Sequence, residues 1–160
     1  MNKKERLKEI KQMIASSRYD DATAALAFFA SECRPTQEAI TSPDAVRNLL
    51  KKYAYATVEY FLLITLDSAQ TPIAIHEITK GIKNNTMTHP REVFRQAILD
   101  DATSVILAHN HPSGKIKPSD EDRAMQRRLV EAGKLLGIQV LDSMIVAKSG
   151  FYSALENQDM

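Results

Sequence analysis

The run SVILAH, residues 104–109, is the feature that most constrains the fold of this chain. A short, uninterrupted apolar run is typical of a strand that is buried on both faces at the centre of a sheet. Pro112 ends the strand because proline has no N–H to donate to a neighbour. His109 and His111 stand at its exit, and residues two apart in an extended chain point to the same side. The sequence therefore predicts a buried strand that carries two histidines at its end.

The segments around this strand predict an α/β (α+β) domain in which helices flank a mixed sheet. From Val58 onward the predicted order is strand, strand, helix, strand, helix, strand, strand. The predicted strands are 58–67, 73–81, 104–109, 138–147 and 151–155, and the predicted helices are 43–54, capped by Ser42, 91–102, and Ser119 to about Leu136, with Gly137 as C-cap. This domain is expected to occupy residues 41–160.

Residues 1–40 are expected to form a short N-terminal helical extension. Apolar residues recur at helical spacing between residues 3 and 16, and a second apolar segment covers 22–30. A polar stretch that contains a proline, residues 32–42, then links the extension to the domain.

Composition and charge exclude several classes of protein. The single cysteine, Cys33, excludes an internal disulfide and a cysteine-based zinc ribbon, and it fits a reducing, cytoplasmic location. There is no secretory signal and no apolar run of about 18 residues, so we expect no membrane span. The formal net charge is +1, which gives little electrostatic support for binding nucleic acid.

His109, His111 and Asp122 are candidate metal ligands. Asp122 lies about one helical turn after Ser119, where a carboxylate can face back towards the strand end. Two imidazoles and one carboxylate make the three-ligand set of a catalytic zinc site, which keeps a position open for water. Two simpler interpretations stay open: the histidines can be ordinary loop residues, and Ser119 with Asp122 can be a helix-capping pair.

A metal-dependent hydrolase also needs a general base, and three glutamates are candidates. Glu59 begins the first strand, Glu77 lies within the second, and Glu92 begins the following helix. Each can equally be an exposed acid on a strand or helix. The spacing along the chain does not choose among them.

The pattern HNHP followed by SDED resembles the His-x-His-Pro and Ser-x-x-Asp signature of the JAMM/MPN metallopeptidases. Three further segments look like the RadC family of bacterial JAB-domain proteins, and the resemblance covers roughly residues 40 to 156. These segments are THPREVFRQAILDDATSVILAHNHPSG, RRLVEAGKLLGIQVLD and SGFYSAL. The resemblance implies an MPN/JAB fold, related to the cytidine deaminase architecture.

Carried over residue by residue, the resemblance implies that His109, His111 and Asp122 hold Zn²⁺. It implies that Ser119 supports the oxyanion of the reaction. In the family the catalytic glutamate opens an early strand before apolar residues, so the resemblance favours Glu59, with Glu77 in reserve.

The expected function is that of a zinc metallopeptidase or isopeptidase, acting on a protein or peptide substrate whose identity the sequence does not indicate. The alternative is a DNA repair or recombination accessory protein of the RadC type without robust peptidase activity. Longer RadC proteins carry an N-terminal helix-hairpin-helix-like region with glycine-rich turns, whereas residues 1–40 here contain no glycine. An inactive JAB scaffold is not favoured, because every motif residue is present. An HNH nuclease is not favoured either, because its residues are spread over a ββα metal finger.

Overall fold

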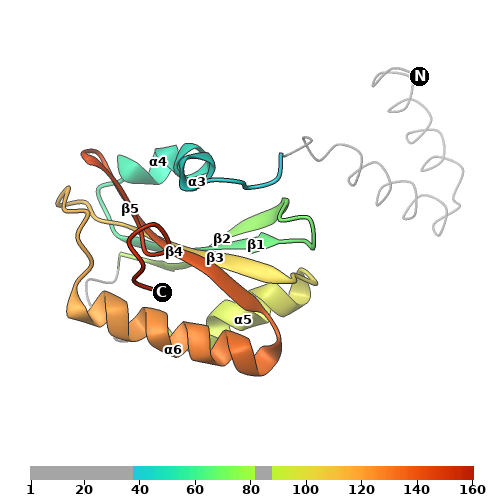
Figure 1. The fold of residues 1–160 in the computed structure, drawn as a ribbon. Coiled ribbons are helices and arrows are strands. Elements are labelled where there is room, and N and C mark those ends of the chain that lie inside the picture. The colour runs from blue at the N-terminus through green and yellow to red at the C-terminus, as the bar shows by residue number, and fades with distance from the viewer. Residues whose placement is uncertain (1–37, 82–87) are drawn as a thin grey trace, which may run out of the picture. The chain divides into compact units, whose positions relative to one another are not determined.

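A computed structural model describes residues 38–81 and 88–160, and a five-stranded sheet lies at the centre of this part of the chain (Figure 1). The strands are β1 Tyr60–Leu66, β2 Pro72–Lys80, β3 Ser104–Asn110, β4 Gln139–Ala147 and β5 Gly150–Ser153. They lie in the order β2-β1-β3-β4-β5, and β3 pairs antiparallel with β1 but parallel with β4. The predicted mixed sheet is confirmed.

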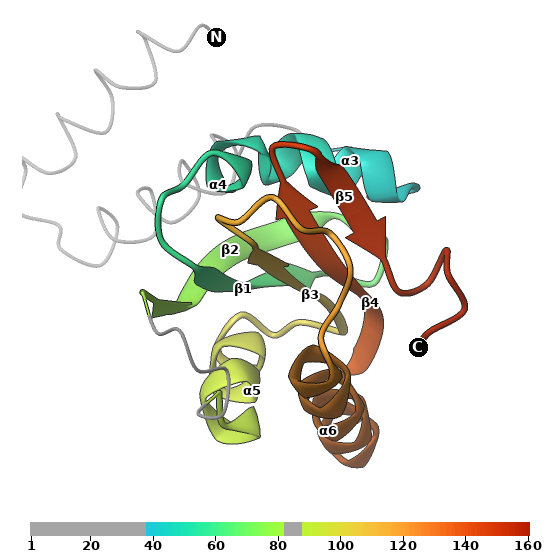
Figure 2. The ribbon, with the colours of Figure 1, turned by 90° about the vertical axis from the view of Figure 1, so that its left-hand side faces the viewer.

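Helices cover both faces of the sheet (Figure 2). On one face lie α3 Pro43–Leu49 and α4 Lys51–Ala54, and on the other lie α5 Pro90–Leu99 and α6 Asp120–Leu136. Side chains alternate between the faces along each strand, so the core divides into two apolar clusters. Leu62 and Ile64 of β1 belong to the α3/α4 cluster, and Phe61 and Leu63 belong to the α5/α6 cluster.

Strand β3 is buried along its whole length, as its apolar sequence predicts. Neighbours on both sides satisfy its main chain, and helical layers cover both of its faces. Its C-terminal residues His109 and Asn110 are only 3% and 1% exposed. The strand therefore delivers polar side chains into a closed environment at one edge of the molecule.

Several predicted boundaries are wrong by one to three residues: the first strand begins at Tyr60, after Glu59, and the helix predicted over 91–102 ends at Leu99. Two further differences have a clear cause. The helix predicted over 43–54 is interrupted at Leu50, where φ −95° and ψ 6° bend the chain and the side chain is fully buried in the core. The last strand ends at Ser153 rather than at Leu155. The cause is the buried carboxylate of Asp142, which accepts hydrogen bonds from the Ser153 hydroxyl at 2.6 Å and the Leu155 N–H at 3.0 Å.

The predicted N-terminal extension, residues 1–40, lies almost entirely outside the described residues. The extension and its boundary with the domain stay predictions. Within residues 38–81 and 88–160, no helix has the length and apolar character needed to cross a membrane.

Gly133 allows α6 to pack closely on β4, and we expect Gly133→Ala to be strongly destabilising. A Cβ there would lie 2.5 Å from the carbonyl oxygen of Ile138 and 3.2 Å from the ring of Phe94. Overpacking a core costs about 1–3 kcal/mol. We expect a cost near the upper end of this range, because a main-chain carbonyl moves aside less easily than a side chain. Alanine's better helix propensity offsets part of that cost. We expect a net loss of about 2 kcal/mol in the free energy of unfolding, measured by urea titration.

The exposed neighbour Lys134 provides the control for this measurement. Lys134→Ala is expected to change the free energy of unfolding by less than about 0.5 kcal/mol. Equal stabilities of the two variants would show that the backbone at Ile138 can move away from the added methyl group.

Candidate metal centre

Three side chains from β3, the loop after it and α6 meet at one edge of the sheet. His109 Nε2 lies 3.3 Å from Asp122 Oδ1, and His111 Nε2 lies 3.7 Å from Asp122 Oδ2. One potential ligand atom from each of the three residues lies within 4.8 Å of the other two. Ligands of a tetrahedral zinc ion, with bonds near 2.0–2.2 Å, stand roughly 3.3 Å apart. The group can therefore hold a metal ion after small side-chain movements.

The surroundings of the two imidazoles suit metal binding. The Nδ1 atom of His111 lies 2.7 Å from the carbonyl oxygen of Lys115. Because a carbonyl oxygen can only accept a hydrogen bond, Nδ1 must carry the hydrogen. In a neutral imidazole, that bond selects the tautomer whose Nε2 lone pair can ligate a metal, as outer partners of ligating histidines commonly do. His109 stacks on Phe61 with ring centroids 6.4 Å apart. Among the described residues, neither of its buried ring nitrogens makes a hydrogen bond, and the polar neighbour of Nε2 is the Asp122 carboxylate at 3.3 Å, so a metal ion would fit between the two groups.

Ser119 holds the carboxylate of Asp122 in place. Ser119 caps α6, accepting the N–H of Asp122 at 3.1 Å. In return, Asp122 Oδ2 accepts the backbone N–H of Ser119 at 2.8 Å and its hydroxyl at 2.7 Å. The capping pair and the candidate ligand are therefore the same residues, and one role does not exclude the other.

Asp122 is ionised at neutral pH. Burial raises the pKa of this carboxyl, but the neighbouring imidazole of His109 and the two hydrogen bonds from Ser119 outweigh burial and hold the pKa well below its usual range. A carboxylate that stays ionised needs no deprotonation before it binds a cation.

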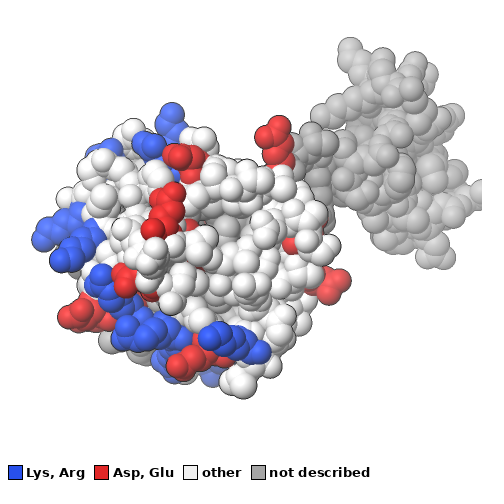
Figure 3. All heavy atoms as spheres, in the orientation of Figure 1, with Lys and Arg blue, Asp and Glu red and all other residues white. Residues whose placement is uncertain are grey.

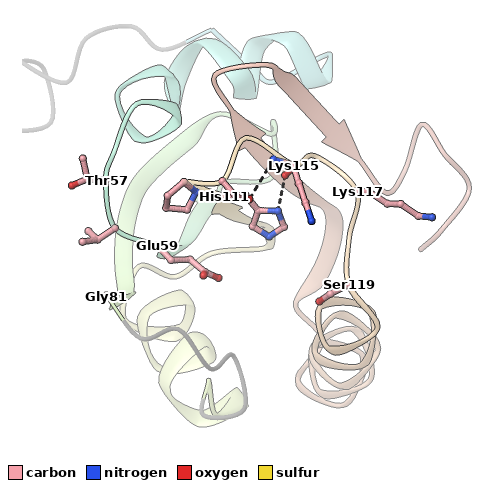
Figure 4. Close-up of a pocket in the computed structure, with 10 residues that line it drawn as sticks. Thr57, Glu59, Gly81, His111, Lys115, Lys117 and Ser119 are labelled. Atoms are coloured by element: carbon pink, nitrogen blue, oxygen red, sulfur yellow. Dashed lines mark hydrogen bonds between the residues drawn. The ribbon is translucent and has the colours of Figure 1, made fainter.

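A pocket of about 420 Å³ opens beside these residues, and His111, Ser119 and Glu59 line it (Figure 4). Glu59 and Ser119 approach from opposite sides, with His111 between them. Glu59 immediately precedes β1 and is half-buried. Lys115 and Lys117, from the loop between β3 and α6, also line the pocket.

The other two candidate bases lie elsewhere. Glu77 is exposed on β2, where it pairs with Leu62 of the α3/α4 face and accepts a hydrogen bond from Tyr53 at 2.8 Å. His109, by contrast, pairs with Phe61 of the opposite face. Glu92 is exposed at the start of α5 and lines a different pocket, with His76 and Glu77. Of the three glutamates, the structure brings Glu59 alone to the pocket beside the histidines.

Sequence reasoning missed two contributors to this site. The first is the carbonyl of Lys115, which orients His111 and carries no signal in the sequence, because every residue has a carbonyl. The second is Asn110, the residue between the two histidines. Its side chain bonds to main-chain groups about 50 residues earlier in the chain. Its place at the end of a buried run, where a polar residue needs partners, is the signal that could have drawn attention to it.

Similarity to known proteins agrees with this geometry. The RadC-like JAB domain family matches residues 40–160. A UPF0758 protein of Alkaliphilus metalliredigens is 48% identical over 122 residues, which are 76% of this chain and 53% of that protein. A UPF0758 protein of Rubrobacter xylanophilus is 42% identical over 124 residues, 77% of this chain and 54% of the relative. The chain thus spans about half the length of the curated relatives it matches. The chain belongs to the RadC-like JAB domain family.

Proposed function

We propose that this chain is a zinc-dependent hydrolase that cleaves an amide bond, as a metallopeptidase or isopeptidase. The observation that carries the proposal is the convergence of His109, His111 and Asp122 beside a pocket that also holds a carboxylate, Glu59. Three protein ligands suit a catalytic rather than a structural zinc site, which would need a fourth.

Each residue has a distinct part in the proposed reaction. A zinc ion held by His109, His111 and Asp122 would supply Lewis acidity, which would lower the pKa of a water molecule and polarise a carbonyl group. Glu59 accepts the proton of the attacking water and passes it to the departing amine nitrogen. The hydroxyl of Ser119 turns from Asp122 towards the pocket and donates to the oxyanion of the tetrahedral intermediate. The backbone N–H of Ser119 continues to hold Asp122 during this rotation.

Metal analysis combined with a hydrolysis assay tests the proposal. We expect the purified protein to contain stoichiometric zinc, and to cleave members of a library of internally quenched peptides that carry α-peptide and ε-lysyl isopeptide bonds. A chelator should abolish cleavage, and added Zn²⁺ should restore it. Protein that neither contains zinc nor binds it when zinc is added would contradict the proposal.

On the face seen in Figure 3, surface charge gives no support to DNA association. Basic side chains there gather at the edges and alternate with acidic ones, and the middle of the face carries neither. A DNA-binding surface usually presents a continuous basic patch. A gel shift with duplex DNA that weakens steeply as salt rises would favour the accessory role instead.

Ser119→Ala is expected to impair both stability and hydrolysis. Loss of the cap should lower the free energy of unfolding by about 1 kcal/mol. Loss of an oxyanion donor should lower kcat by about 10²- to 10³-fold. Ser42, which caps α3 through the N–H of Ala45, is the matched control. Ser42→Ala should also lower stability, as followed by thermal unfolding, while hydrolysis stays at the wild-type rate. Wild-type hydrolysis by both variants would reduce Ser119 to a helix cap.

A further inference from the structure

Asn110 has a buried polar side chain beside the candidate site, but it has no role in the proposed reaction. It is the last residue of β3 and is 1% exposed. Its carboxamide oxygen accepts the N–H of Tyr60 at 2.7 Å, and its amide nitrogen donates to the carbonyl of Val58 at 3.0 Å. These two main-chain groups lie immediately on either side of Glu59. Asn110 therefore hydrogen-bonds to the backbone immediately before and immediately after the proposed base.

These two side-chain hydrogen bonds begin where the main-chain hydrogen bonds between β1 and β3 end. The last paired residues of these strands are Phe61 and His109. Beyond this pair, the side chain of Asn110 supplies one acceptor and one donor in place of the next backbone unit. A carboxamide suits this task because it carries both groups side by side, whereas a carboxylate has no donor and a hydroxyl is too short to span both.

A third hydrogen bond holds the same segment from the side of β2. The N–H of Gly81, at the end of β2, donates to the carbonyl of Glu59 at 2.7 Å. Gly81 has φ +74°, a conformation that glycine adopts without strain. The backbone at Glu59 is thus fixed between the ends of β2 and β3, which leaves the rotamer of its side chain as its main freedom.

We propose that Asn110 is a positioning residue that sets the location of Glu59 relative to the metal ligands His109 and His111. Asn110 shares its backbone with both histidines, so one residue links the base to two of the three ligands. This inference rests on the proposed function, because it takes Glu59 as the base. A misplacement of about 1 Å in such an arrangement can lower a rate by about 10²-fold without any change in the reacting groups.

The test compares Asn110→Ala with Thr65→Ala, a matched change at the other end of β1. Thr65 is fully buried, accepts the N–H of Ala74 at 3.1 Å and donates to Asp100 at 2.6 Å. Both variants lose buried hydrogen bonds and should be destabilised alike. Asn110→Ser, which reaches at most one of the two partners, serves as a milder second variant if Asn110→Ala fails to fold.

Two measurements follow, and the first does not depend on activity. Amide hydrogen exchange at Tyr60 should be about tenfold faster in Asn110→Ala than in Thr65→Ala, because its hydrogen-bond acceptor is gone. Zn²⁺ affinity, measured by competition with a chromogenic chelator, should match that of the wild type. The second measurement is hydrolysis of the quenched-peptide library, for which we expect kcat about 10²-fold lower in Asn110→Ala and close to wild type in Thr65→Ala.

A double variant separates positioning from a general structural effect. If Asn110 acts through Glu59, adding Asn110→Ala to Glu59→Gln should cost little further activity. Unchanged exchange at Tyr60, equal kcat losses in Asn110→Ala and Thr65→Ala, or full additivity with Glu59→Gln would each overturn the positioning role. Unchanged hydrolysis in Glu59→Gln itself would instead overturn the proposed function, whatever Asn110 does.

Discussion

Glu59→Gln is expected to lower the kcat for amide hydrolysis by about 10²- to 10⁴-fold, the usual contribution of a positioned general base. Glutamine has nearly the same shape but cannot accept the proton of the attacking water at neutral pH. Because Glu59 is not one of the three candidate ligands, zinc content and thermal stability should stay at wild-type values. The measurement is a steady-state assay on the quenched-peptide library beside metal analysis of the same preparation.

The other two glutamates provide the controls for this prediction. Glu77→Gln and Glu92→Gln change the same functional group at exposed positions away from the histidines, and both should hydrolyse at the wild-type rate. A large loss in Glu77→Gln with none in Glu59→Gln would assign the base to β2 and would contradict the geometry of the pocket. Loss of zinc in Glu59→Gln would show a ligand rather than a base.

Asp122→Asn is expected to weaken Zn²⁺ binding by more than about 100-fold. Removing a residue that only hydrogen-bonds to a ligand already costs up to about 100-fold, and removing a ligand should cost more. The amide keeps the shape of the carboxylate but removes its charge. Competition with a chromogenic chelator measures the affinity. Thermal unfolding gives a second readout, since a ligand at 100 times its dissociation constant stabilises the folded state by about 2.7 kcal/mol. Zinc should raise the Tm of the wild type and leave that of the variant unchanged.

Asp142→Asn is the control for this change. Asp142 and Asp122 are comparably buried, at 4% and 5% exposure, and each accepts hydrogen bonds from nearby serines. Asp142→Asn should lower stability, because one amide oxygen replaces the two carboxylate oxygens that accept from Ser153 and Leu155, while zinc still raises the Tm. Equal zinc affinity in Asp122→Asn and the wild type would exclude Asp122 as a ligand.

The fold could be predicted where local sequence decides the structure. The uninterrupted apolar run that becomes β3 indicates a central strand, because a short apolar run of this kind is typical of strands buried on both faces. Ser119 and Gly137 mark the ends of α6 because a serine side chain and a left-handed glycine, here at φ 70°, satisfy the free groups of a helix. His109, His111 and Asp122 could be recognised as a candidate ligand set because they lie close together in the sequence.

Partners far apart in the chain could not be predicted from spacing. The position of Glu59 beside the pocket depends on the pairing of Phe61 with His109, and that of Glu77 depends on its pairing with Leu62. Periodicity does not determine such registers. The end of β5 likewise depends on Asp142, whose carboxylate captures the N–H of Leu155 in place of a further strand residue.

The pairing of β1 with β3 also implies an order of assembly during folding. The candidate ligands occupy one continuous stretch, residues 109–122, so an unfolded chain can already gather them around a metal ion at small entropic cost. Glu59 joins them only when β1 docks on β3, a contact that spans 50 residues between Tyr60 and Asn110 and is therefore slow to form. Under the proposed function, a nascent chain can therefore gather the three candidate ligands before Glu59 reaches them, and hydrolysis requires that β1 has docked on β3.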